Sequence, residues 1–411
     1  MNIYESMKDG TIAEHISKIS EADKNFWQKS KVVIVIHEAT TGLAYDFRDY
    51  LLRQGVQELL FIAHPLLYLK ENFKNSSRYE LYKDSKLVKS HTAFHWVLPE
   101  PLLYIKDFLY TILWCIGSKY NLFFGIDNLN AFSGYVLKLL GRVDKVIYYV
   151  IDYIPKRFSN KFFNMIYHKI EKFAAENSDW TWNLSPRMIE ERSRRWNKKF
   201  SNQLVVSHGV NVNRIKRLPL DKINSTEILY MGSLLKKQGI QLVIQILPLI
   251  VKKIPTIQLT IIGKGPYEKE LKQLTREMNL DGHVSFLGYI ENHKDMENRI
   301  AKAALAIALY DKKNDEFSYY ADPGKIKNYL GAGVPVILTD VPYVAREVVR
   351  AKCGFIIQYT KKDLLDILLM FFLDKKLMKE YRYNAVRFAK KYDWDRIFAN
   401  ALAYLNHDKT N

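Results

Sequence analysis

Residues 319–342, YYADPGKIKNYLGAGVPVILTDVP, decide how the second half of this chain is interpreted. A turn at 322–324 precedes a predicted short helix over 325–330, and two glycines end that helix because glycine tolerates the left-handed conformation. The apolar run 334–338 then predicts a buried strand. A helix that begins at a sheet edge, with Lys325 in its first turn, suits a bound phosphate. The stretch fits an ordinary helix–strand connection with a solvated lysine equally well.

Length and composition indicate a globular protein of two domains. A chain of 411 residues exceeds one typical core, and its apolar share of 48% and charged share of 26% are ordinary. Cys115 and Cys353 form neither a disulfide framework nor a metal-binding spacing, which predicts a reducing, cytoplasmic compartment. The net charge of +18 predicts attraction to nucleic acid, anionic membranes or phosphorylated substrates, and charge alone does not choose among them.

Neither end of the chain nor its most apolar helix predicts a membrane-spanning protein. The first residues, MNIYESMKDGTIAEHISK, are polar and mixed in charge, so no signal peptide is expected. The apolar helix predicted over 101–117 is interrupted by Lys106 and Asp107, which leaves a run too short to cross a bilayer. We therefore expect a cytoplasmic protein, with peripheral attachment to the inner face of the cell membrane as an option.

Strands and helices alternate through both halves of the chain. Continuous apolar runs such as 32–36 and 146–151 predict parallel strands that are buried on both faces. The polar segment 213–226 is the best linker, and it places the domain boundary near residue 218. The expected fold class is α/β, with two Rossmann-like parallel-sheet domains. Ligands of such sheets lie at the carboxyl ends of the strands, so a cleft between the domains is the expected site.

Four turns of the second half follow four predicted strands and should converge on one sheet edge. They are Gly232-Ser233, 263–266, 286–289 and 322–325. Glycines let a ligand approach the backbone, and the nearby Lys237 and Lys325 could neutralise phosphate charge. Each glycine taken alone is equally consistent with an ordinary strand–helix turn. Their order along the chain is harder to explain in that way.

The segments MGSLLKKQGIQLVI, LTIIGKGPYEKELKQL, VSFLGYI and DPGKIKNYLGAGVPVILTD resemble the four signature segments of GT-B glycosyltransferases. The resemblance is to the family-4, or group 1, enzymes of bacterial surface-polysaccharide synthesis, strong over 227–359 and weak in the first half. It implies a GT-B fold with an acceptor-side domain over 1–217, a nucleotide-sugar-binding domain over 218–385, and a helix within 386–411 that returns to the first domain. The implied reaction transfers a sugar from a nucleotide-diphosphate-sugar to a hydroxyl of a glycan or lipid-linked glycan.

The resemblance also implies roles for individual residues of the donor site. The base would be bordered by the 263–266 turn and the 286–290 loop, and the phosphates would be contacted from the other turns and from the first domain. The residues concerned are Gly42, Gly232, Ser233, Lys237, Gly263, Lys264, Gly265, Pro266, Tyr289, Asp322, Pro323, Gly324, Lys325 and Asn328. The donor is a substrate, UDP- or GDP-sugar by expectation, so no cofactor is predicted.

The sequence departs from the family pattern at several positions. Tyr320 and Asn328 occupy the positions of the usual pair of glutamates, and Ser233 replaces an arginine. Phosphate binding is still expected, but a ribose-binding glutamate is not, and the stereochemical outcome stays open. A non-catalytic scaffold of the same fold and a nucleotide-sugar epimerase are the alternatives. No nucleic-acid-binding motif is present, so nucleic acid is not an expected partner.

A carboxylate at a strand end of the first half is the expected catalytic base. Asp152 follows a buried strand, where a partly desolvated carboxylate could accept the proton of an acceptor hydroxyl. It could equally cap the following turn. Asp127, His37 and Glu38, also at strand ends, are weaker candidates. No Asp-x-Asp pair or His/Cys cluster predicts a metal.

Basic and aromatic residues alternate over 156–172, and a second basic run covers 192–199. This pattern is typical of an amphipathic helix on an anionic membrane surface, where each basic residue adds about 1 kcal/mol. The alternative is a packing helix with a solvated basic face. On the membrane interpretation, the acceptor would be a lipid-linked sugar.

Overall fold

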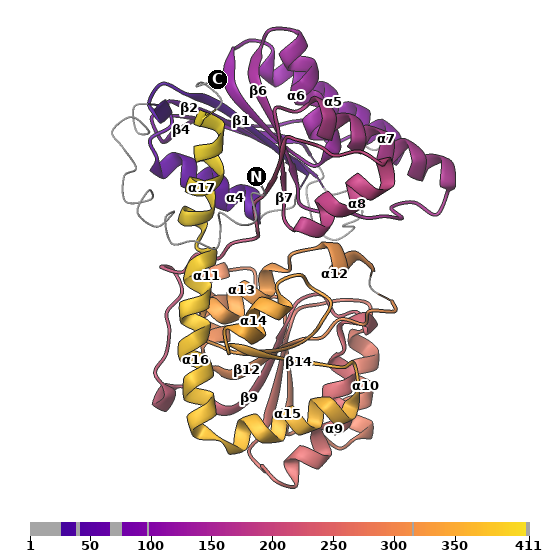
Figure 1. The fold of residues 1–411 in the computed structure, drawn as a ribbon, viewed down its shortest axis with the longest axis vertical. Helices are drawn as coiled ribbons and strands as arrows, with labels where there is room; N and C mark the ends of the chain where they lie inside the picture. The colour runs from indigo at the N-terminus through magenta and orange to yellow at the C-terminus, as the bar shows by residue number, and fades with distance from the viewer. Residues whose placement is uncertain (1–25, 38–41, 66–75, 97, 315, 408–411) are drawn as a thin grey trace. The chain divides into compact units, whose positions relative to one another are not determined.

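The computed structural model describes residues 26–37, 42–65, 76–96, 98–314 and 316–407 of the chain (Figure 1). The chain divides into two compact units. Unit 1 comprises Met1–Val206 and Ile397–Asn411, and unit 2 comprises Ser207–Arg396. The expected α/β class with two mainly parallel sheets is confirmed. Glu38 lies outside the described residues, as does most of the polar lead-in over 1–30.

Unit 1 is built on an eight-stranded sheet with the order β4-β3-β2-β1-β5-β6-β7-β8. The strands β2, β1, β5, β6, β7 and β8 are parallel. The strands β3 and β4 form an antiparallel hairpin at one edge of the sheet, whereas a parallel sheet was predicted. Asp84 and Ser85 turn the hairpin with φ of 46° and 62°, as a two-residue turn requires. The strands are β1 Lys31–His37, β2 Glu58–His64, β3 Arg78–Lys83, β4 Lys86–Thr92, β5 Tyr120–Ile126, β6 Val143–Val150, β7 Trp180–Asn183 and β8 Gln203–Val205.

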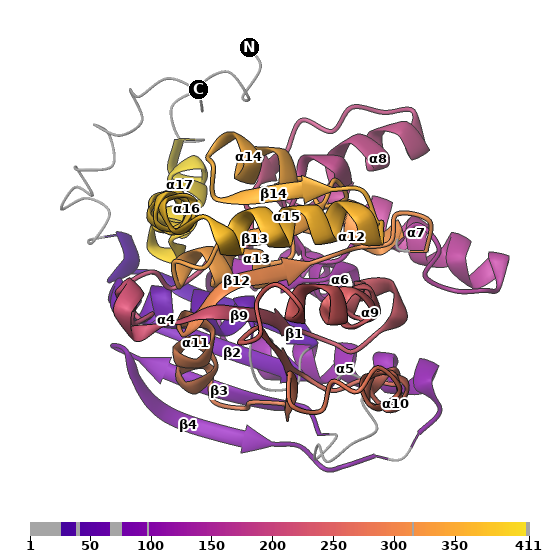
Figure 2. The same ribbon diagram turned by 90° about the horizontal axis from the view of Figure 1, so that it is seen from below.

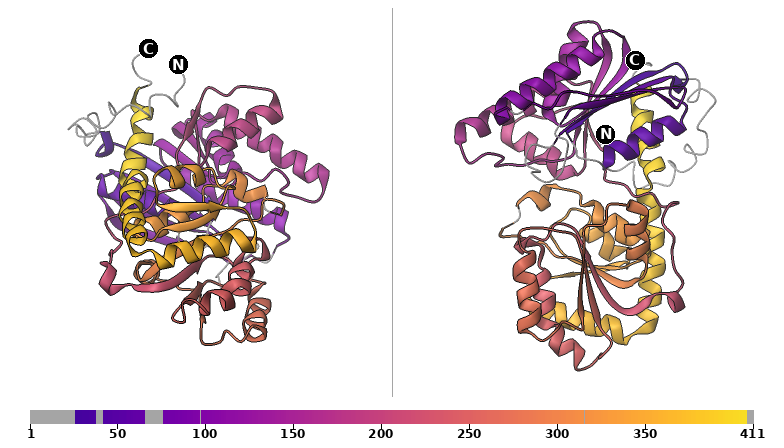
Figure 3. Two further views of the ribbon diagram at one scale, coloured as in Figure 1. Left: turned by 60° about the horizontal axis from the view of Figure 1, so that its bottom comes forward. Right: turned by 180° about the vertical axis from the view of Figure 1, so that it is seen from behind.

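Helices cover both faces of this sheet (Figures 1 and 3). Successive side chains of β5 point to opposite faces of the sheet. Phe123 faces α6, where a Cβ on Gly134 would lie 2.4 Å from its ring. Phe124 faces α4, where its ring centroid lies 4.7 Å from that of Phe47. Phe47 also contacts Phe398 of α17 at 4.7 Å. One layer holds α5 Glu100–Cys115, α6 Asn128–Leu139 and α7 Lys161–Asn177, and the other holds α4 Leu43–Arg53 and α17 Trp394–His407; α8 is Pro186–Trp196.

Unit 2 is built on a parallel six-stranded sheet with the order β11-β10-β9-β12-β13-β14, part of which can be followed from label to label in Figure 2. Counted within the unit this is the order 3-2-1-4-5-6, the doubly wound arrangement, and the order reverses between β9 and β12. Ligands of such sheets bind beyond the carboxyl ends of the strands at that point. The strands are β9 Asn224–Met231, β10 Gln258–Ile262, β11 Val284–Gly288, β12 Ala303–Ala308, β13 Val336–Thr339 and β14 Gly354–Ile357.

Two apolar clusters, one on each face, pack the helices of unit 2 onto its sheet. One cluster joins α11 His293–Ala301, α13 Gly324–Gly331, α14 Ala345–Arg350 and α16 Lys375–Ala389 to the sheet. The other joins α9 Ile240–Val251, α10 Glu268–Glu277 and α15 Lys361–Leu373. A short α12, Glu316–Tyr320, precedes the 322–325 turn. Single turns of 3-10 helix are η1 Leu220–Lys222, η2 Lys236–Gln238 and η3 Lys390–Tyr392.

Along the sequence, unit 2 begins directly after Val206, which is eleven residues before the boundary expected at 217/218. Residues 207–217 belong to unit 2 because their backbone is bonded to it: Val210 N–H donates to Tyr392 O at 2.8 Å, and Val212 N–H donates to the Asp393 carboxylate at 3.1 Å. The return to unit 1 begins at Ile397 rather than at residue 386, since α16 packs against α13. Among the described residues, no helix is both long and apolar enough to cross a membrane.

Candidate functional site

Lys325 and Gly232 meet beyond the carboxyl end of β9, where the strand order of unit 2 reverses. A Cβ on Gly232 would lie 3.3 Å from the Lys325 Nζ. The ammonium donates to Gln238 Oε1 at 2.6 Å and lies over the rings of Tyr230 and Tyr310, 4.8 and 5.0 Å from their centroids. The helix start of α13 and its lysine therefore converge on the first strand turn, as the 319–342 stretch suggested.

Tyr329 fixes α13 against β9. Its hydroxyl accepts a hydrogen bond from Met231 N–H at 2.7 Å and donates to Met231 O at 3.2 Å, so it satisfies the backbone directly before Gly232. Complete burial raises the pKa of Tyr329 far above its usual value, and the hydroxyl stays neutral. The position of Lys325 relative to Gly232 thus depends on a buried contact one helical turn away.

Asp322 and Gly324, predicted to bind the donor, are occupied by contacts within unit 2. The Asp322 carboxylate pairs with the buried Lys327 ammonium and accepts from His208 N–H at 2.8 Å. A Cβ on Gly324 would lie 2.4 Å from the His208 ring. These two residues shape the turn before α13, and of the two helix lysines it is Lys325 that reaches the strand edge.

The glycine turns of unit 2 pack against one another through their backbones. Gly232 N–H donates to Ile262 O at 3.0 Å, and Gly263 N–H donates to Gly288 O at 2.8 Å. A Cβ on Gly263 would lie 2.0 Å from Gly232 O, and one on Gly265 would lie 2.4 Å from Leu234 O. The predicted convergence of these turns is present in the structure. Their glycines are required by the neighbouring turn, whether or not a ligand also approaches them.

The other predicted donor-binding residues lie around this edge with differing exposure. Ser233, Lys264, Pro266 and Tyr289 are exposed, whereas Lys237, Pro323 and Asn328 are half-buried. Gly42 begins α4 of unit 1 with a φ of 144°, and residues 38–41 before it lie outside the described part of the chain. Gln238, Tyr230 and Tyr310, which surround the Lys325 ammonium, were not predicted, because nothing in their local sequence marks them.

In unit 1, His37 and Asp127 form a pair where the strand order reverses between β1 and β5. His37 Nδ1 lies 2.9 Å from Asp127 Oδ2, and the other carboxylate oxygen accepts from Leu129 N–H and Asn130 N–H, each at 3.0 Å. Asp127 has φ 86° and ψ 169°, a conformation found almost only in glycine, at a cost of order 1–3 kcal/mol. Strained residues of this kind cluster at functional sites.

Asp107 of α5 lies behind this pair and connects it to a second histidine. Its completely buried carboxylate is 3.4 Å from His37 Nε2, 3.4 Å from His64 Nδ1 and 3.0 Å from Lys106 Nζ, and it accepts from Ser77 Oγ at 2.7 Å. Burial raises the pKa of Asp107, but the two histidines outweigh it and hold that pKa well below its usual range. The cluster was missed at the sequence level, although a Lys-Asp pair inside an apolar helix was a signal for it.

The charge states of the two histidines differ. Burial lowers the pKa of His37, but the carboxylates of Asp127 and Asp107 outweigh burial and raise it to about 9. Burial also lowers the pKa of His64, and the contact with Asp107 does not compensate, so that ring is neutral at pH 7. His37 is therefore held as an imidazolium between two carboxylates, with Nδ1 hydrogen-bonded to Asp127 and Nε2 at an ion-pair distance of 3.4 Å from Asp107.

Asp152 follows β6, the strand beside β5, and the residue is exposed to solvent. Its surroundings nevertheless desolvate the carboxyl group enough to raise the pKa of Asp152. Arg157 acts in the opposite direction, and the charge of Asp127 raises it further. Unlike Asp127, whose oxygens accept from backbone and ring donors, Asp152 combines exposure with a raised pKa. These are the properties expected of a general base.

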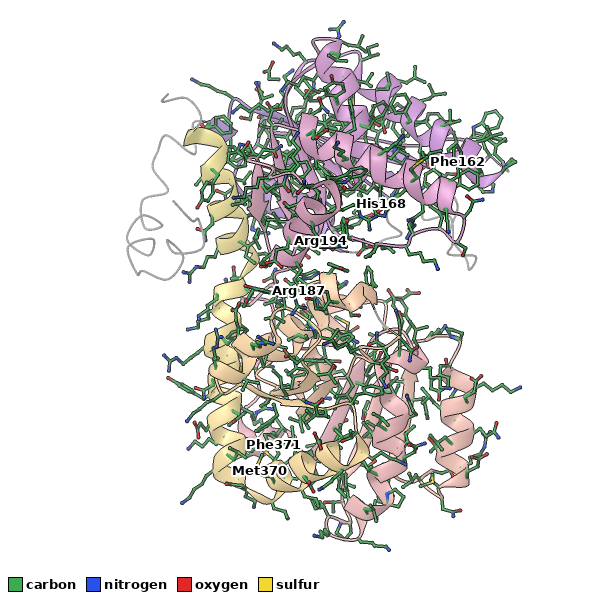
Figure 4. All side chains as sticks on the ribbon, turned by 45° about the vertical axis from the view of Figure 1, so that its right-hand side comes forward. Phe162, His168, Arg187, Arg194, Met370 and Phe371 are labelled. Atoms are coloured by element: carbon green, nitrogen blue, oxygen red, sulfur yellow. The ribbon has the colours of Figure 1, made fainter. Side chains whose placement is uncertain are left out.

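The two basic segments predicted to face a membrane differ in the structure. The first turns of α7 expose Phe162 and Phe163, and Figure 4 shows Phe162 at the outer end of that helix. Arg192, by contrast, is completely buried: its Nε donates to Glu171 at 2.6 Å, and its Nη1 donates to Asn183 Oδ1 at 2.9 Å. Arg192 therefore does not contribute to the cationic surface that was expected over 192–199. In the described part of the chain, no cluster of three His, Cys, Asp or Glu side chains is arranged to hold a metal ion.

Two doubly wound units with a lysine at the strand edge of the second define a GT-B glycosyltransferase fold. Residues 214–388 match the family described as glycosyl transferases group 1, so unit 2 carries a group 1 glycosyltransferase domain. The resemblance seen in the four sequence segments is confirmed. An uncharacterized glycosyltransferase of Haemophilus influenzae is 25% identical over 100 residues, which is 24% of this chain and only 28% of that relative's length.

Solved structures of the same fold cover nearly the whole chain. Sucrose-phosphate synthase from Thermosynechococcus elongatus has a TM-score of 0.69 at 16% identity, covering 92% of this chain and 99% of its own. HepE from Anabaena, in complex with UDP and glucose, has a TM-score of 0.64 at 14% identity over 92% and 99%. WaaG, a glycosyltransferase involved in lipopolysaccharide biosynthesis, has a TM-score of 0.63 at 14% identity over 91% and 99%. At these identities the similarity establishes the fold alone.

Proposed function

We propose that this protein transfers a sugar from a nucleotide-diphosphate-sugar to a hydroxyl of a glycan or lipid-linked glycan in cell-surface polysaccharide synthesis. The observation that carries the proposal is the Lys325 ammonium beside Gly232 at the strand-order reversal of unit 2. The helix start and the lysine both favour a diphosphate at that edge. HepE, of the same fold, binds UDP in its solved structures, which supports a UDP-sugar, with a GDP-sugar as the other expectation.

Lys325 acts in this proposal on the leaving group. Negative charge grows on the diphosphate as its bond to the anomeric carbon breaks, and a fixed ammonium stabilises that charge more than it stabilises the bound donor. The ammonium is already held by Gln238 and by two aromatic rings, so little reorganisation is needed when the charge develops. The remaining donor contacts are assigned to the exposed groups around this edge, among them Ser233, Lys264 and Tyr289.

Asp152 is the proposed base. The acceptor oxygen forms the new bond to the anomeric carbon, the bond to the diphosphate breaks, and the hydroxyl proton passes to the Asp152 carboxylate. The raised pKa of Asp152 and its exposure support this role. His37 and Asp127 would position the strand ends beside it, since their polar atoms are already engaged. The proposal involves no resident cofactor or metal.

The place of the reaction is proposed to be the cytoplasmic face of the cell membrane. The basic and aromatic first turns of α7, with Phe162 and Phe163 exposed beside Lys161, support contact with anionic lipids. A non-catalytic scaffold is the second candidate. Tyr320 and Asn328, which stand where the family has acids, favour it.

A transfer assay separates the two candidates. Thermal shift with UDP-, GDP-, ADP- and CMP-sugars identifies the donor, because a ligand stabilises the folded state that binds it. Donor hydrolysis and transfer are then measured for Lys325→Met, which should lose about 10²–10³-fold in kcat. Lys376→Met, an exposed lysine of α16, is the control and should keep its activity. Donor binding without any turnover would favour the scaffold, and near-normal turnover of Lys325→Met would overturn the role of that lysine.

A further inference from the structure

Helix α5 of unit 1 has its charged and apolar side chains in unexpected places. Its described charged side chains, Lys106 and Asp107, are buried. Its large exposed side chains are apolar, and together with that of the adjoining Ile116 they are between 42% and 64% exposed. They recur every three or four residues, so they lie on one face of the helix. This face, the α5 stripe, consists of Leu102, Ile105, Leu109, Leu113 and the adjoining Ile116.

The α5 stripe is not needed to complete the core of unit 1. The buried side of α5 already packs through Cys115, which belongs to the apolar cluster formed with β1, β2 and β5. Its polar groups are also in use, since Asp107 contacts His37 and His64. A surface helix normally presents polar residues to water, and a contiguous apolar face on a folded protein marks an interaction site.

Aromatic and basic residues adjoin the stripe. Phe94 and Trp96, both exposed, come just before α5, and Trp96 Nε1 donates to Tyr110 Oη of the helix at 3.0 Å. Lys89 of the exposed edge strand β4 lies over the ring of Tyr79, 5.9 Å from its centroid, and Tyr79 contacts Trp114 of α5 at 5.1 Å between ring centroids. Aromatic contacts continue through the helix layer from Phe108 of α5 to Phe132 of α6, at 5.8 Å, and on to α7. The contact to α7 is made by Phe173 in the last turns of that helix, so α5, α6 and α7 belong to one helix layer.

We propose that the α5 stripe docks into the surface of an anionic lipid bilayer, with α5 lying in the interface. Apolar and aromatic side chains partition to the boundary between headgroups and acyl chains, and basic residues around them attract anionic headgroups. The net charge of +18 complements such a surface. The same charge opposes a second copy of this chain as the occupant. The large exposed side chains of the stripe are all apolar, which suits acyl chains better than the carboxylates of an acidic protein partner.

Docking of α5 would also connect the membrane to the polar cluster of unit 1, because the same helix carries Asp107. The inference does not rest on the proposed function, since vesicle binding is measured without donor or acceptor. It adds a surface on α5 to the sequence-based expectation, which placed the membrane surface at 156–172 and 192–199.

Vesicle sedimentation tests the proposal with the full-length protein. Vesicles of phosphatidylcholine and phosphatidylglycerol are compared with phosphatidylcholine alone, at low salt and at about 0.5 M NaCl. The wild type should bind the anionic vesicles and lose most of that binding at high salt. Leu109→Asp/Leu113→Asp should bind at least about tenfold more weakly, because two carboxylates would enter the interface.

A matched variant keeps the test specific. Leu249→Asp/Leu373→Asp changes two leucines of unit 2 that are 49% and 64% exposed, against 51% and 64% for Leu109 and Leu113. It should bind vesicles as the wild type does. The proposal is overturned if the wild type does not bind anionic vesicles, or if the α5 variant and the matched variant bind equally. A thermal-shift response to donor sugars that survives in the α5 variant would show that the donor site is intact.

Two further outcomes would assign the stripe to a different occupant. If the α5 variant melts several degrees lower than the matched variant, the stripe is covered by other parts of this chain; exposed positions should change the melting temperature by no more than about 2 °C. If the wild type is a dimer in gel filtration and the α5 variant is a monomer, a second copy covers the stripe. Either result would contradict docking on lipid.

Discussion

Raising the pH from about 6.5 to about 8 should destabilise unit 1, because folding holds a proton on His37 that the unfolded chain releases. The pKa of His37 is about 9 in the folded protein, where Asp127 and Asp107 outweigh the effect of burial. An unfolded histidine has a pKa of about 6.5. Between these values the folded state binds one more proton than the unfolded state, so the free energy of unfolding falls as the pH rises.

The magnitude follows from this difference of one proton. The free energy of unfolding should fall by up to about 1.2 kcal/mol per pH unit and by about 1.6 kcal/mol from pH 6.5 to 8, because the unfolded histidine is still half protonated at pH 6.5. The His37 side chain is only 8% exposed, so solvent screens its carboxylates little. Other groups act mainly outside this window, and His64 opposes the effect of His37 only near pH 6.5, where an unfolded histidine is half protonated. Burial lowers the pKa of His64, whose effect appears below about pH 6.5, and raises the pKa of Cys115, whose effect begins above about pH 8.5.

Urea denaturation followed by tryptophan fluorescence measures this effect. Of the 7 tryptophans, only Trp394 belongs to unit 2, so the signal reports mainly on unit 1. The control is His37→Gln, which keeps a hydrogen-bonding side chain but cannot bind the proton, and its stability should be nearly constant over the same range. A wild-type slope below about 0.3 kcal/mol per pH unit, or an equal slope in His37→Gln, would refute the assignment of a charged His37.

Two further predictions concern other parts of unit 1. Arg192→Met should lower the free energy of unfolding by about 3–5 kcal/mol, because Glu171 would remain buried without its cation; a loss below about 1 kcal/mol in the same denaturation assay would contradict a structural role for this ion pair. Asp152→Asn should lower kcat for sugar transfer by about 10²–10⁴-fold while leaving the thermal shift with donor sugar unchanged, since it removes a proton acceptor and not a donor contact. Transfer at a rate close to that of the wild type would move the base elsewhere in unit 1.

The alternation of strands and helices was predictable from sequence because the signals are local. Continuous apolar runs indicated parallel strands, and parallel strands bring their carboxyl ends to one edge. The convergence of Gly232, the 263–266 turn and Lys325 followed from that rule together with the family resemblance. Less predictable was the hairpin β3-β4, whose residues are exposed or half-buried and therefore carry no clear apolar period.

The partners of individual side chains were not predictable, because they come from distant parts of the chain. Lys325 and Lys327 are two residues apart on one short helix, yet the first reaches Gln238 and the second pairs with Asp322. Arg192, in a run that resembles a cationic surface, is buried against Glu171 from the preceding helix. Only packing in three dimensions determines which charged side chain forms a buried ion pair and which lies at the edge of the sheet.

The start of α13 was marked by the sequence alone, since the Asp-Pro-Gly turn, the following lysine and the closing glycines are all contained in the 319–342 stretch. What the tertiary structure decided is where that lysine points and which neighbours hold it. In the same way, the sequence determined that α5 is an apolar helix interrupted by Lys106 and Asp107. Only the packed sheet shows that the charged residues are inside, next to His37, and that the leucines remain outside, because burial depends on what covers a helix and not on its composition.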